Sequence, residues 1–413
     1  MPKNTPYSLP KDSKAWRQAV DSVASLMPED VDLHDFDALQ PLPVFALIVV
    51  LPAHVSALDI HHYVQSWVDK QPNWHLVTVA EDKEATFVDI EVNTSTANIG
   101  TVNIDTTEAI LGTKTTSKPP FIPAQVFRYL LVPVTATLMH PAKKTAAAHM
   151  IDEQLTSSLR RDLAADYNNN HPDAKDVAVD SQSLVDCHIL SIGQMLRTHK
   201  MVCFDMDSTL IEQEVIVELG KVAGVGEQVE SITEAAMRGE IDFDDSFAQR
   251  VALLKDVPTT VLDEICARLT LSVGARTTIS AFKTLGYHTV LVSGGFTYFA
   301  RYIAEQLGID EVHANHLDIE DGMVTGHVQT PILNGAKKAA IVAQTAERLG
   351  LNMAEVVCVG DGANDLPMIA LADLGVAYKA KPIVQARADA AVNVTGLEGV
   401  LYALGYPALT PTK

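Results

Sequence analysis

The sequence has no long hydrophobic run, and this absence excludes an ordinary membrane protein. Its longest strongly apolar stretch covers only residues 44–51, whereas a helix that spans a bilayer needs about 20 such residues. The first residues, Met-Pro-Lys-Asn-Thr, contain no apolar segment of the kind found in signal peptides. We therefore expect a protein with no membrane partner and no export signal.

Cysteines are scarce and widely separated. The sequence has four, Cys187, Cys203, Cys266 and Cys358, and none belongs to the CxxC pairs that zinc sites and redox motifs use. Three of them lie within apolar segments. This pattern predicts reduced, buried thiols and a cytoplasmic location.

Basic residues are also in short supply. Lysine and arginine total 31 against 52 aspartates and glutamates, which gives a formal net charge of −21. Such a surface repels nucleic acid and anionic membranes, so we expect neither as a partner. An anionic small-molecule substrate would need a local positive site, such as a metal ion, an arginine or a lysine.

The length of 413 residues and a hydrophobic content of 47% predict a globular protein of two domains. Over residues 1–195 the patterns predict a small α+β domain of βαββαβ type, with a loop-rich insertion at 94–125. Its expected helices are 14–26, 60–68 and 151–163. Its expected strands are 44–51, 74–80, 86–92, 127–136 and 184–192.

The pattern changes over residues 196–413. Apolar runs at 201–204, 289–292 and 356–359 each end abruptly in polar residues. Amphipathic helices are expected between them, at 275–285, 296–307 and 339–349, and each is followed by glycine. This alternation predicts a doubly wound, Rossmann-like parallel sheet covered on both faces. Residues 212–273 are too long for a simple crossover and predict an inserted helical cap.

Two carboxylates follow the first of these strands. Asp205 and Asp207 leave the strand at positions i and i+2, so both are expected to face one site. Carboxylates that close together repel each other unless a cation lies between them or one is protonated. One could therefore act as an ionised nucleophile and the other as an acid and base, although an isolated DxD is more often an acidic turn.

Three further clusters occupy equivalent places. Ser293-Gly294-Gly295 opens a helix and offers backbone N–H groups to an anion. Lys338 follows, with Lys337 beside it, and the run 360–365 supplies small residues and hard oxygen ligands suited to Mg²⁺. Each cluster alone could be a simple turn or solvated surface, but all four at strand ends or helix starts indicate one active site at the carboxyl edge of the sheet.

The segments DMDSTL, SGGF, the downstream lysine and GDGANDLPM resemble the four motifs of haloacid dehalogenase-like phosphatases, over about residues 199–405. In the cap, Glu214, the run TEAAMRG at 233–239, Phe243 and Arg250 resemble the branch of this superfamily that acts on phosphoserine. The resemblance implies Mg²⁺-dependent hydrolysis of O-phospho-L-serine through an aspartyl-phosphate, which is the last step of serine biosynthesis.

The resemblance also implies roles for individual residues. Asp205 would be the nucleophile and Asp207 the general acid and base. Asp205, the backbone carbonyl of Asp207, and Asp361 would hold Mg²⁺, with Asp365 supporting them. Lys338 is preferred to Lys337 because its spacing to Asp361 fits the family.

The remaining site residues that the resemblance implies bind the substrate. The phosphate would be held by Ser293, Gly294, Lys338 and Asn364. Glu214 and Arg250 would bind the ammonium and carboxylate groups of the amino acid, and Met237 and Phe243 would close the cap over it.

Other functions stay open at this point. A phosphotransferase that moves phosphate to homoserine would share the same motifs, and a non-catalytic sensor of phosphorylated amino acids would share the binding residues. The N-terminal half resembles the ACT-like extension of some bacterial members of the family. This likeness implies either an amino-acid-binding regulatory role or a packing role that forms a homodimer.

Overall fold

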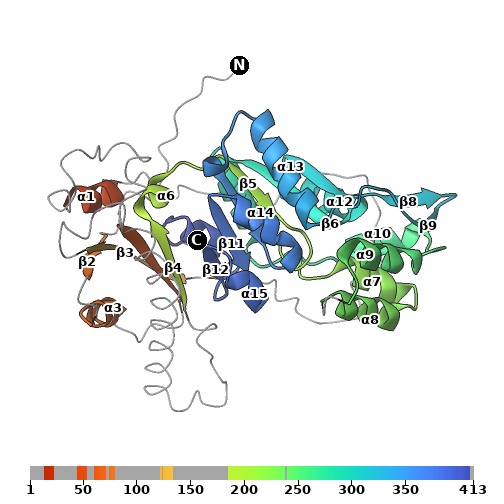
Figure 1. Ribbon diagram of the computed structural model, residues 1–413, viewed down its shortest axis with the longest axis horizontal. Helices are drawn as coiled ribbons and strands as arrows, with labels where there is room; N and C mark the ends of the chain where they lie inside the picture. Colours follow the sequence, from red (N-terminus) through yellow and green to blue (C-terminus); the bar gives the residue numbers. More distant parts are fainter. Residues whose placement is uncertain are drawn as a thin grey trace, which may run out of the picture.

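The structure is a computed structural model that describes residues 14–22, 44–53, 60–70, 74–79, 121–122, 124–133, 185–237 and 240–409. Figure 1 shows an N-terminal sheet at one end of the molecule, a second sheet with its helices in the middle, and a helical cap at the other end. None of the described helices is long and apolar enough to cross a membrane.

The central sheet has six strands in the order β12-β11-β10-β5-β6-β7, and all neighbouring strands are parallel. Every residue of β5 and β10, the two middle strands, is buried, as expected for a sheet covered on both faces. The doubly wound prediction is therefore confirmed. The strands are β5 (Met201–Phe204), β6 (His288–Phe296), β7 (Glu311–Asn315), β10 (Val356–Gly360), β11 (Leu374–Tyr378) and β12 (Ala390–Val392).

Alternate residues of the central strands point into two separate cores. Val202 and Phe204 of β5 pack with α11 (Ala275–Thr284) and α12 (Thr297–Leu307) on one face. Met201 and Cys203 pack on the other face, where the covering helices contribute Val342, Ala346, Met368 and Val384. Those helices are α13 (Gly335–Arg348), α14 (Leu366–Leu371) and α15 (Pro382–Gln385).

Helix α13 begins earlier than the sequence pattern predicts, at Gly335 instead of residue 339. The cause is a helix cap, because the side chain of Asn334 accepts a hydrogen bond from the backbone N–H of Lys337 at 3.1 Å. Apolar periodicity does not detect such a polar first turn. As a consequence, Lys338 is held in the first turn of a helix and not in a loop.

The segment 212–273, where the sequence predicts a helical insertion between β5 and β6, contains four helices. They are α7 (Val215–Val222), α8 (Gly226–Met237), α9 (Phe243–Ala252) and α10 (Thr259–Arg268). A hairpin of β8 (Leu317–Glu320) and β9 (Met323–Val328) reaches across to this cap, as Figure 1 shows. Val324 exchanges backbone hydrogen bonds of 2.8 Å with Asp256 and Val257, and Thr259 N–H donates to Gly322 O at 2.9 Å. The hairpin therefore ties the α9–α10 turn to the central sheet.

The N-terminal sheet is antiparallel, with the order β2-β3-β1-β4. This order fits a βαββαβ arrangement, although the predicted strand 86–92 and the predicted helix 151–163 lie outside the described residues. β3 begins three residues before the predicted strand 127–136 because residues 124–126 pair with the end of β1. The elements are α1 (Lys14–Ser22), β1 (Phe45–Pro52), α3 (Ile60–Val68), β2 (Trp74–Thr78), β3 (Ala124–Pro133) and β4 (Asp186–Ser191).

The two sheets share a core. Leu47 and Val49 of β1 pack toward α3, whereas Ile48 and Val50 belong to the same buried cluster as Leu401. Leu401 lies in α16 (Gly399–Ala403). Helix α6 (Ile192–Leu196) connects β4 to the central sheet. Asp186 of β4 accepts hydrogen bonds from the backbone N–H groups of Asn393 and Val394, at 2.8 and 3.0 Å.

A buried carboxyl group strengthens this junction. Glu398 is fully buried, and its Oε1 accepts from the backbone N–H groups of Ile122 and Gly396 at 2.8 and 2.9 Å. Gly274 adopts a positive φ of 82°, and a Cβ there would lie 1.8 Å from Glu398 Oε2. Glycine is therefore required at 274 by both its backbone conformation and this close approach. Burial raises the pKa of Glu398 from 4.5 to about 7.

This raised pKa makes a prediction about stability and pH. An acid whose pKa is higher in the folded state stabilises the fold below its unfolded pKa, and this contribution is lost as the pH rises through the folded pKa. Glu398→Gln imitates the protonated acid. As the pH rises from 5 to 8, the free energy of unfolding of the wild type should therefore fall by up to roughly 3 kcal/mol relative to that of the variant. Urea unfolding of both proteins across this range measures the difference. Glu305→Gln, at an exposed position on α12, should show no such trend, and a flat difference for Glu398→Gln would contradict the assignment.

Candidate active site

The predicted polar residues meet at the carboxyl edge of the central sheet. Asp205 follows β5, Ser293 lies near the end of β6, and Asp361 follows β10. The backbone N–H of Asp205 donates to Val359 O of β10 at 3.0 Å. Parallel strands bring their carboxyl ends to one edge, which is why motifs far apart in the sequence become neighbours.

Lys338 is the centre of this site. Its Nζ lies 2.8 Å from Asp205 Oδ1 and 2.7 Å from Asp365 Oδ1, and its side chain is 0% exposed. Burial alone lowers the pKa of Lys338, but the two carboxylates outweigh burial and raise it. Lys338 is therefore a permanent positive charge in the site, whereas Lys337 is exposed.

Three carboxylates form a potential cation site. Oxygen atoms of Asp205, Asp361 and Asp365 all lie within 4.8 Å of one another. Asp365 already uses both oxygens: Oδ1 contacts Lys338, and Oδ2 accepts from the N–H groups of Asp361 and Gly362 at 3.1 and 2.9 Å. Asp365 therefore shapes the loop, and Asp205 and Asp361 are the better placed ligands.

The charges on these groups favour a divalent cation. Burial, followed by the charge of Asp365, raises the pKa of Asp205, and burial raises the pKa of Asp361 to about 7. A cation between the two carboxylates would relieve this repulsion and keep both ionised. Because the donors are hard oxygens, they fit Mg²⁺.

Asp207 differs from Asp205 in its surroundings. Its Oδ1 accepts from the backbone N–H of Val215 at 3.1 Å, and burial, followed by the charge of Glu214, raises its pKa well above the usual range. A Cβ at Gly295 would lie 2.9 Å from Asp207 Oδ2 and 3.1 Å from Ser293 Oγ. Asp207 is thus suited to carry a proton next to the Ser293 loop.

The loop 293–296 has the features of an anion cradle. Ser293 is fully buried, and its Oγ accepts from Gly295 N–H at 2.9 Å. A Cβ at Gly294 would lie 3.5 Å from Phe243 Cζ of the cap and 3.9 Å from Asn364 Nδ2. Gly294, Phe243 and Asn364, all predicted site residues, therefore border one space.

Asn315, at the end of β7, was not predicted. It is 4% exposed. Its Nδ2 donates to Gly294 O at 2.8 Å, and its Oδ1 accepts from Leu333 N–H at 2.7 Å. These bonds fix the peptide that presents the loop. The sequence shows only an asparagine after a short strand-like run, and its burial is visible only in the structure.

The predicted cap residues are only partly brought together. Arg250 is placed by hydrogen bonds from Nε to Ser246 O and from Nη1 to Thr233 Oγ1, at 3.2 and 3.4 Å. Burial lowers the pKa of Arg250, while the charges of Glu214 and Asp207 act in the opposite direction, so these acids lie within its electrostatic reach. The side chain of Met237 and residues 238–239 lie outside the described part of the chain.

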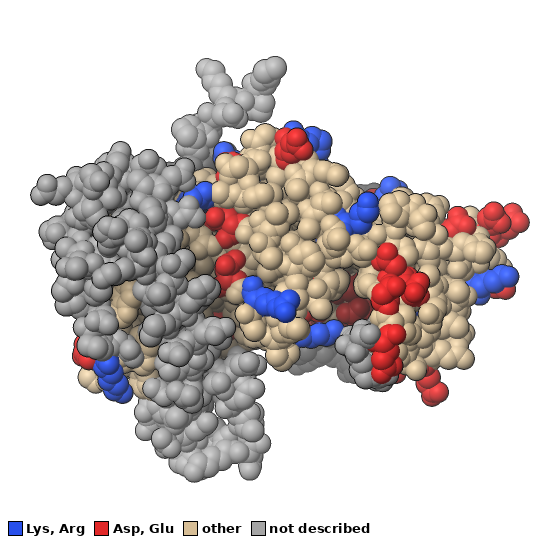
Figure 2. Space-filling view, viewed as in Figure 1, with Lys and Arg blue, Asp and Glu red and all other residues tan. Residues whose placement is uncertain are grey.

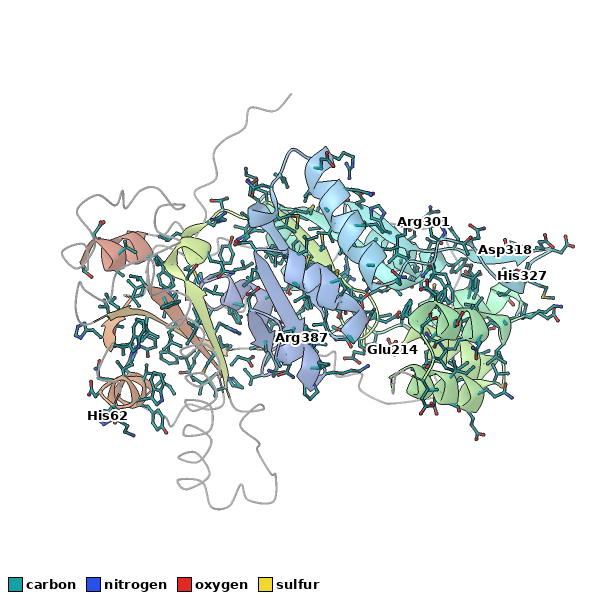
Figure 3. The ribbon with its side chains drawn as sticks, in the orientation of Figure 1. His62, Glu214, Arg301, Asp318, His327 and Arg387 are labelled. Atoms are coloured by element: carbon teal, nitrogen blue, oxygen red, sulfur yellow. The ribbon has the colours of Figure 1, made fainter. Side chains whose placement is uncertain are left out.

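Glu214 lies at the junction of the central sheet and the cap, as Figure 3 shows. It precedes α7 and accepts a hydrogen bond from Ser208 Oγ at 2.8 Å. Ser208 has a positive φ of 54°. This local turn leads the chain from the DMDSTL motif into the cap.

A second contact between cap and sheet domain was also not predicted. Asn334 Nδ2 donates to both carboxylate oxygens of Asp244 in α9, at 3.0 and 3.2 Å. The same asparagine caps α13 through its Oδ1. The position of the cap is therefore linked to the helix that carries Lys338.

Comparisons with known proteins show which family this chain resembles. Residues 199–373 match the haloacid dehalogenase-like hydrolase family. A probable phosphoserine phosphatase of Schizosaccharomyces pombe is 44% identical over 237 residues, which are 56% of this chain and 80% of that protein. A phosphoserine phosphatase of Streptomyces coelicolor is 45% identical over 221 residues, 54% of each chain, so the match covers only about half of that relative.

The fold also resembles the unliganded crystal structure of a probable phosphoserine phosphatase from Vibrio cholerae. The TM-score is 0.54 at 24% identity, over 94% of this chain and 93% of that chain. This likeness shows a shared fold.

The burial of Lys338 predicts a large effect on stability. Lys338→Met keeps the apolar stem but leaves Asp205 and Asp365 buried without their countercharge, so it should destabilise the metal-free protein by about 3–5 kcal/mol. Urea unfolding with a chelator at pH 7.5 measures this loss. The deficit should shrink at acidic pH, where Asp205 takes up a proton.

Lys337→Met is the matched control, because it removes the same charge from the neighbouring position. It should change stability by no more than about 0.5 kcal/mol. Equal effects of the two substitutions would contradict the placement of Lys338.

Proposed function

This chain belongs to the haloacid dehalogenase-like hydrolases and is a phosphatase, and on that premise we propose that it hydrolyses O-phospho-L-serine. The products would be L-serine and phosphate. The observation that carries the proposal is the pairing of Asp205 with the buried ammonium of Lys338, next to Asp207 with its raised pKa. The names of the relatives supply the substrate, and the cap residues supply the groups that would recognise it.

Asp205 is proposed to attack phosphorus. A bond forms between a carboxylate oxygen of Asp205 and phosphorus while the ester P–O bond breaks, and Asp207 gives its proton to the leaving serine oxygen. Asp207, now ionised, then takes a proton from a water molecule whose oxygen bonds to phosphorus. The P–O bond to Asp205 breaks in this step, which releases phosphate and restores the Asp205 carboxylate. The two neighbouring carboxylates thus take different roles because their surroundings differ.

The phosphoryl oxygens would be held by positive or polar groups. Lys338 lies next to the nucleophile, and Ser293 Oγ, the Gly294 N–H and the Asn364 amide border the same space. Asp205, the backbone carbonyl of Asp207, and Asp361 are proposed to hold Mg²⁺, which when bound supplies positive charge to the phosphoryl oxygens.

The cap is proposed to select the amino acid. Figure 2 shows acidic side chains gathered over the cap in this view, so an anionic substrate needs a specific positive partner there. Arg250 can bind a carboxylate with its planar guanidinium, and Glu214 can pair with an ammonium group. Phe243 borders the reacting space and, with Met237, would close it.

Further parts of the proposal concern the whole chain. Residues 196–413, including the cap at about 212–273, would form the catalytic domain, and residues 1–195 an ACT-like regulatory or dimerising domain. The four cysteines are buried and free, which supports a reducing, cytoplasmic location. The reaction would complete serine biosynthesis.

The proposed nucleophile predicts a clear kinetic result. Asp205→Asn removes the attacking carboxylate and should abolish turnover of p-nitrophenyl phosphate, including the pre-steady-state burst. Asp207→Asn should keep a burst with this substrate, because general acid help of about 10²–10⁴-fold matters least for a good leaving group. Stopped-flow absorbance distinguishes the two variants. A burst from Asp205→Asn would overturn the assignment of the nucleophile.

The cap residues predict selectivity. Arg250→Ala and Glu214→Gln should each lower kcat/KM for L-phosphoserine by at least about tenfold, since losing one partner of a desolvated charge pair costs about 2–5 kcal/mol. Both should affect p-nitrophenyl phosphate much less, because it has neither the carboxylate nor the ammonium. Parallel assays of both substrates test this. Equal losses would mean that these residues support only the fold, and the choice of phosphoserine would lose its chemical basis.

A further inference from the structure

A cavity lies beside Asn315, the residue that holds the Ser293 loop. It has a volume of about 360 Å³, and α12, β7, the segment 329–333 and α13 form its walls. This size falls in the range of small-molecule sites, about 300–1,000 Å³. Arg301, which lines it, lies well away from Glu214 in Figure 3. The cavity is thus separate from the junction between the cap and the sheet domain.

The lining of this cavity is basic. Arg301, Lys337, His313 and His316 all line it, and no aspartate or glutamate does. The chain as a whole carries a net charge of −21 with its histidines counted as neutral, so a cavity lined by two permanent cations, two histidines and no acid departs from the average surface. Thr297, Gln329 and Thr330 add neutral polar groups to the same walls.

Some cations of the same domain are already paired with acids, whereas the two permanent cations of the cavity pair with no acid that the structure describes. Lys283 pairs with Asp310, Arg348 with Glu311, and Lys200 with Glu355. Within the described part of the chain, Arg301 and Lys337 have no such acidic partner. His313 is already oriented by a 2.7 Å contact with Glu311. Arg301 and Lys337 are therefore available to an external anion.

The cavity touches the active-site loop through one residue. Asn315 lines it together with Leu333, and Asn315 is the side chain that holds both Gly294 O and Leu333 N–H. Lys337 also precedes Lys338 on α13 but points into this other space. An occupant would therefore contact the back of the elements that present Gly294 and Lys338.

We propose that this cavity binds a small phosphate-bearing anion as an effector, separately from the phosphate ester that is hydrolysed. Arg301 and Lys337 supply the charge, and the guanidinium of Arg301 can donate two parallel hydrogen bonds to phosphate oxygens. The histidines and threonines provide further donors. Occupancy would act on the reaction through Asn315 and the Gly294 peptide. The proposal does not depend on which phosphate ester is the substrate.

Binding of inorganic pyrophosphate to the full-length protein tests this site. Calorimetric titration is performed with a chelator present and at 0.15 M salt, so that metal binding and long-range charge effects do not dominate. The wild type should bind, and the double variant Arg301→Ala/Lys337→Ala should bind at least about tenfold more weakly. The double variant should still hydrolyse p-nitrophenyl phosphate.

A matched control separates a site from net charge. Lys255→Ala/Arg387→Ala removes two exposed cations that do not line the cavity, and it should bind pyrophosphate like the wild type. Equal weakening in the control would mean general attraction only and would overturn the proposal. If both double variants bind pyrophosphate as tightly as the wild type, pyrophosphate lies in the active site and the proposal is overturned. The proposal is also overturned if the wild type does not bind pyrophosphate at millimolar concentration.

Citrate serves as a carboxylate probe of the ligand class. We expect it to bind more weakly than pyrophosphate to the wild type. Equal affinity would overturn the assignment of phosphate as the recognised group. These experiments measure binding and not turnover. A negative binding result would therefore leave the proposed hydrolysis of phosphoserine standing, and a lack of phosphoserine hydrolysis would leave the proposed effector site standing.

Discussion

The ion pair network of Lys338 is the constraint on which the active site depends. The carboxyl edge of the sheet gathers Asp205, Asp361 and Asp365 within 4.8 Å, and carboxylates so close together would repel one another and distort the loops. The buried ammonium, in contact with two of them, allows this concentration of charge without solvent. Removal of water also makes the remaining electrostatic interactions stronger. The same lysine therefore stabilises the fold and, in the proposed reaction, lies beside the nucleophile.

The arrangement also depends on where helix α13 begins. Asn334 caps the helix and contacts Asp244 of the cap, so one side chain sets the start of the helix and its relation to the cap. A later start would leave Lys338 in a mobile loop, where holding its long side chain between two acids would cost more conformational entropy. A cap hydrogen bond thereby contributes to the order of the catalytic centre.

Much of this could be predicted from the sequence because its signals are local. The buried strands before Asp205, Ser293 and Asp361, and the glycine after α12, follow from apolar runs and helix stops, and the motif residues then meet because parallel strands end at one edge. Asn315 and the pair Asp244–Asn334 could not be predicted, since their partners are chosen by tertiary packing. The shared core of the two sheets could not be predicted for the same reason: the continuous apolar run of β1 indicates two buried faces but not what covers each of them.

The hairpin β8–β9 has a consequence for protein engineering. Its backbone hydrogen bonds to Asp256, Val257 and Thr259 attach the inserted helices to the sheet domain, in addition to the two chain connections and the Asn334–Asp244 contact. An exchange of residues 212–273 between relatives would therefore transfer the cap without the hairpin that it contacts. A functional chimera would have to carry the hairpin with the helices, so the unit that evolution or a designer can swap is discontinuous in the sequence.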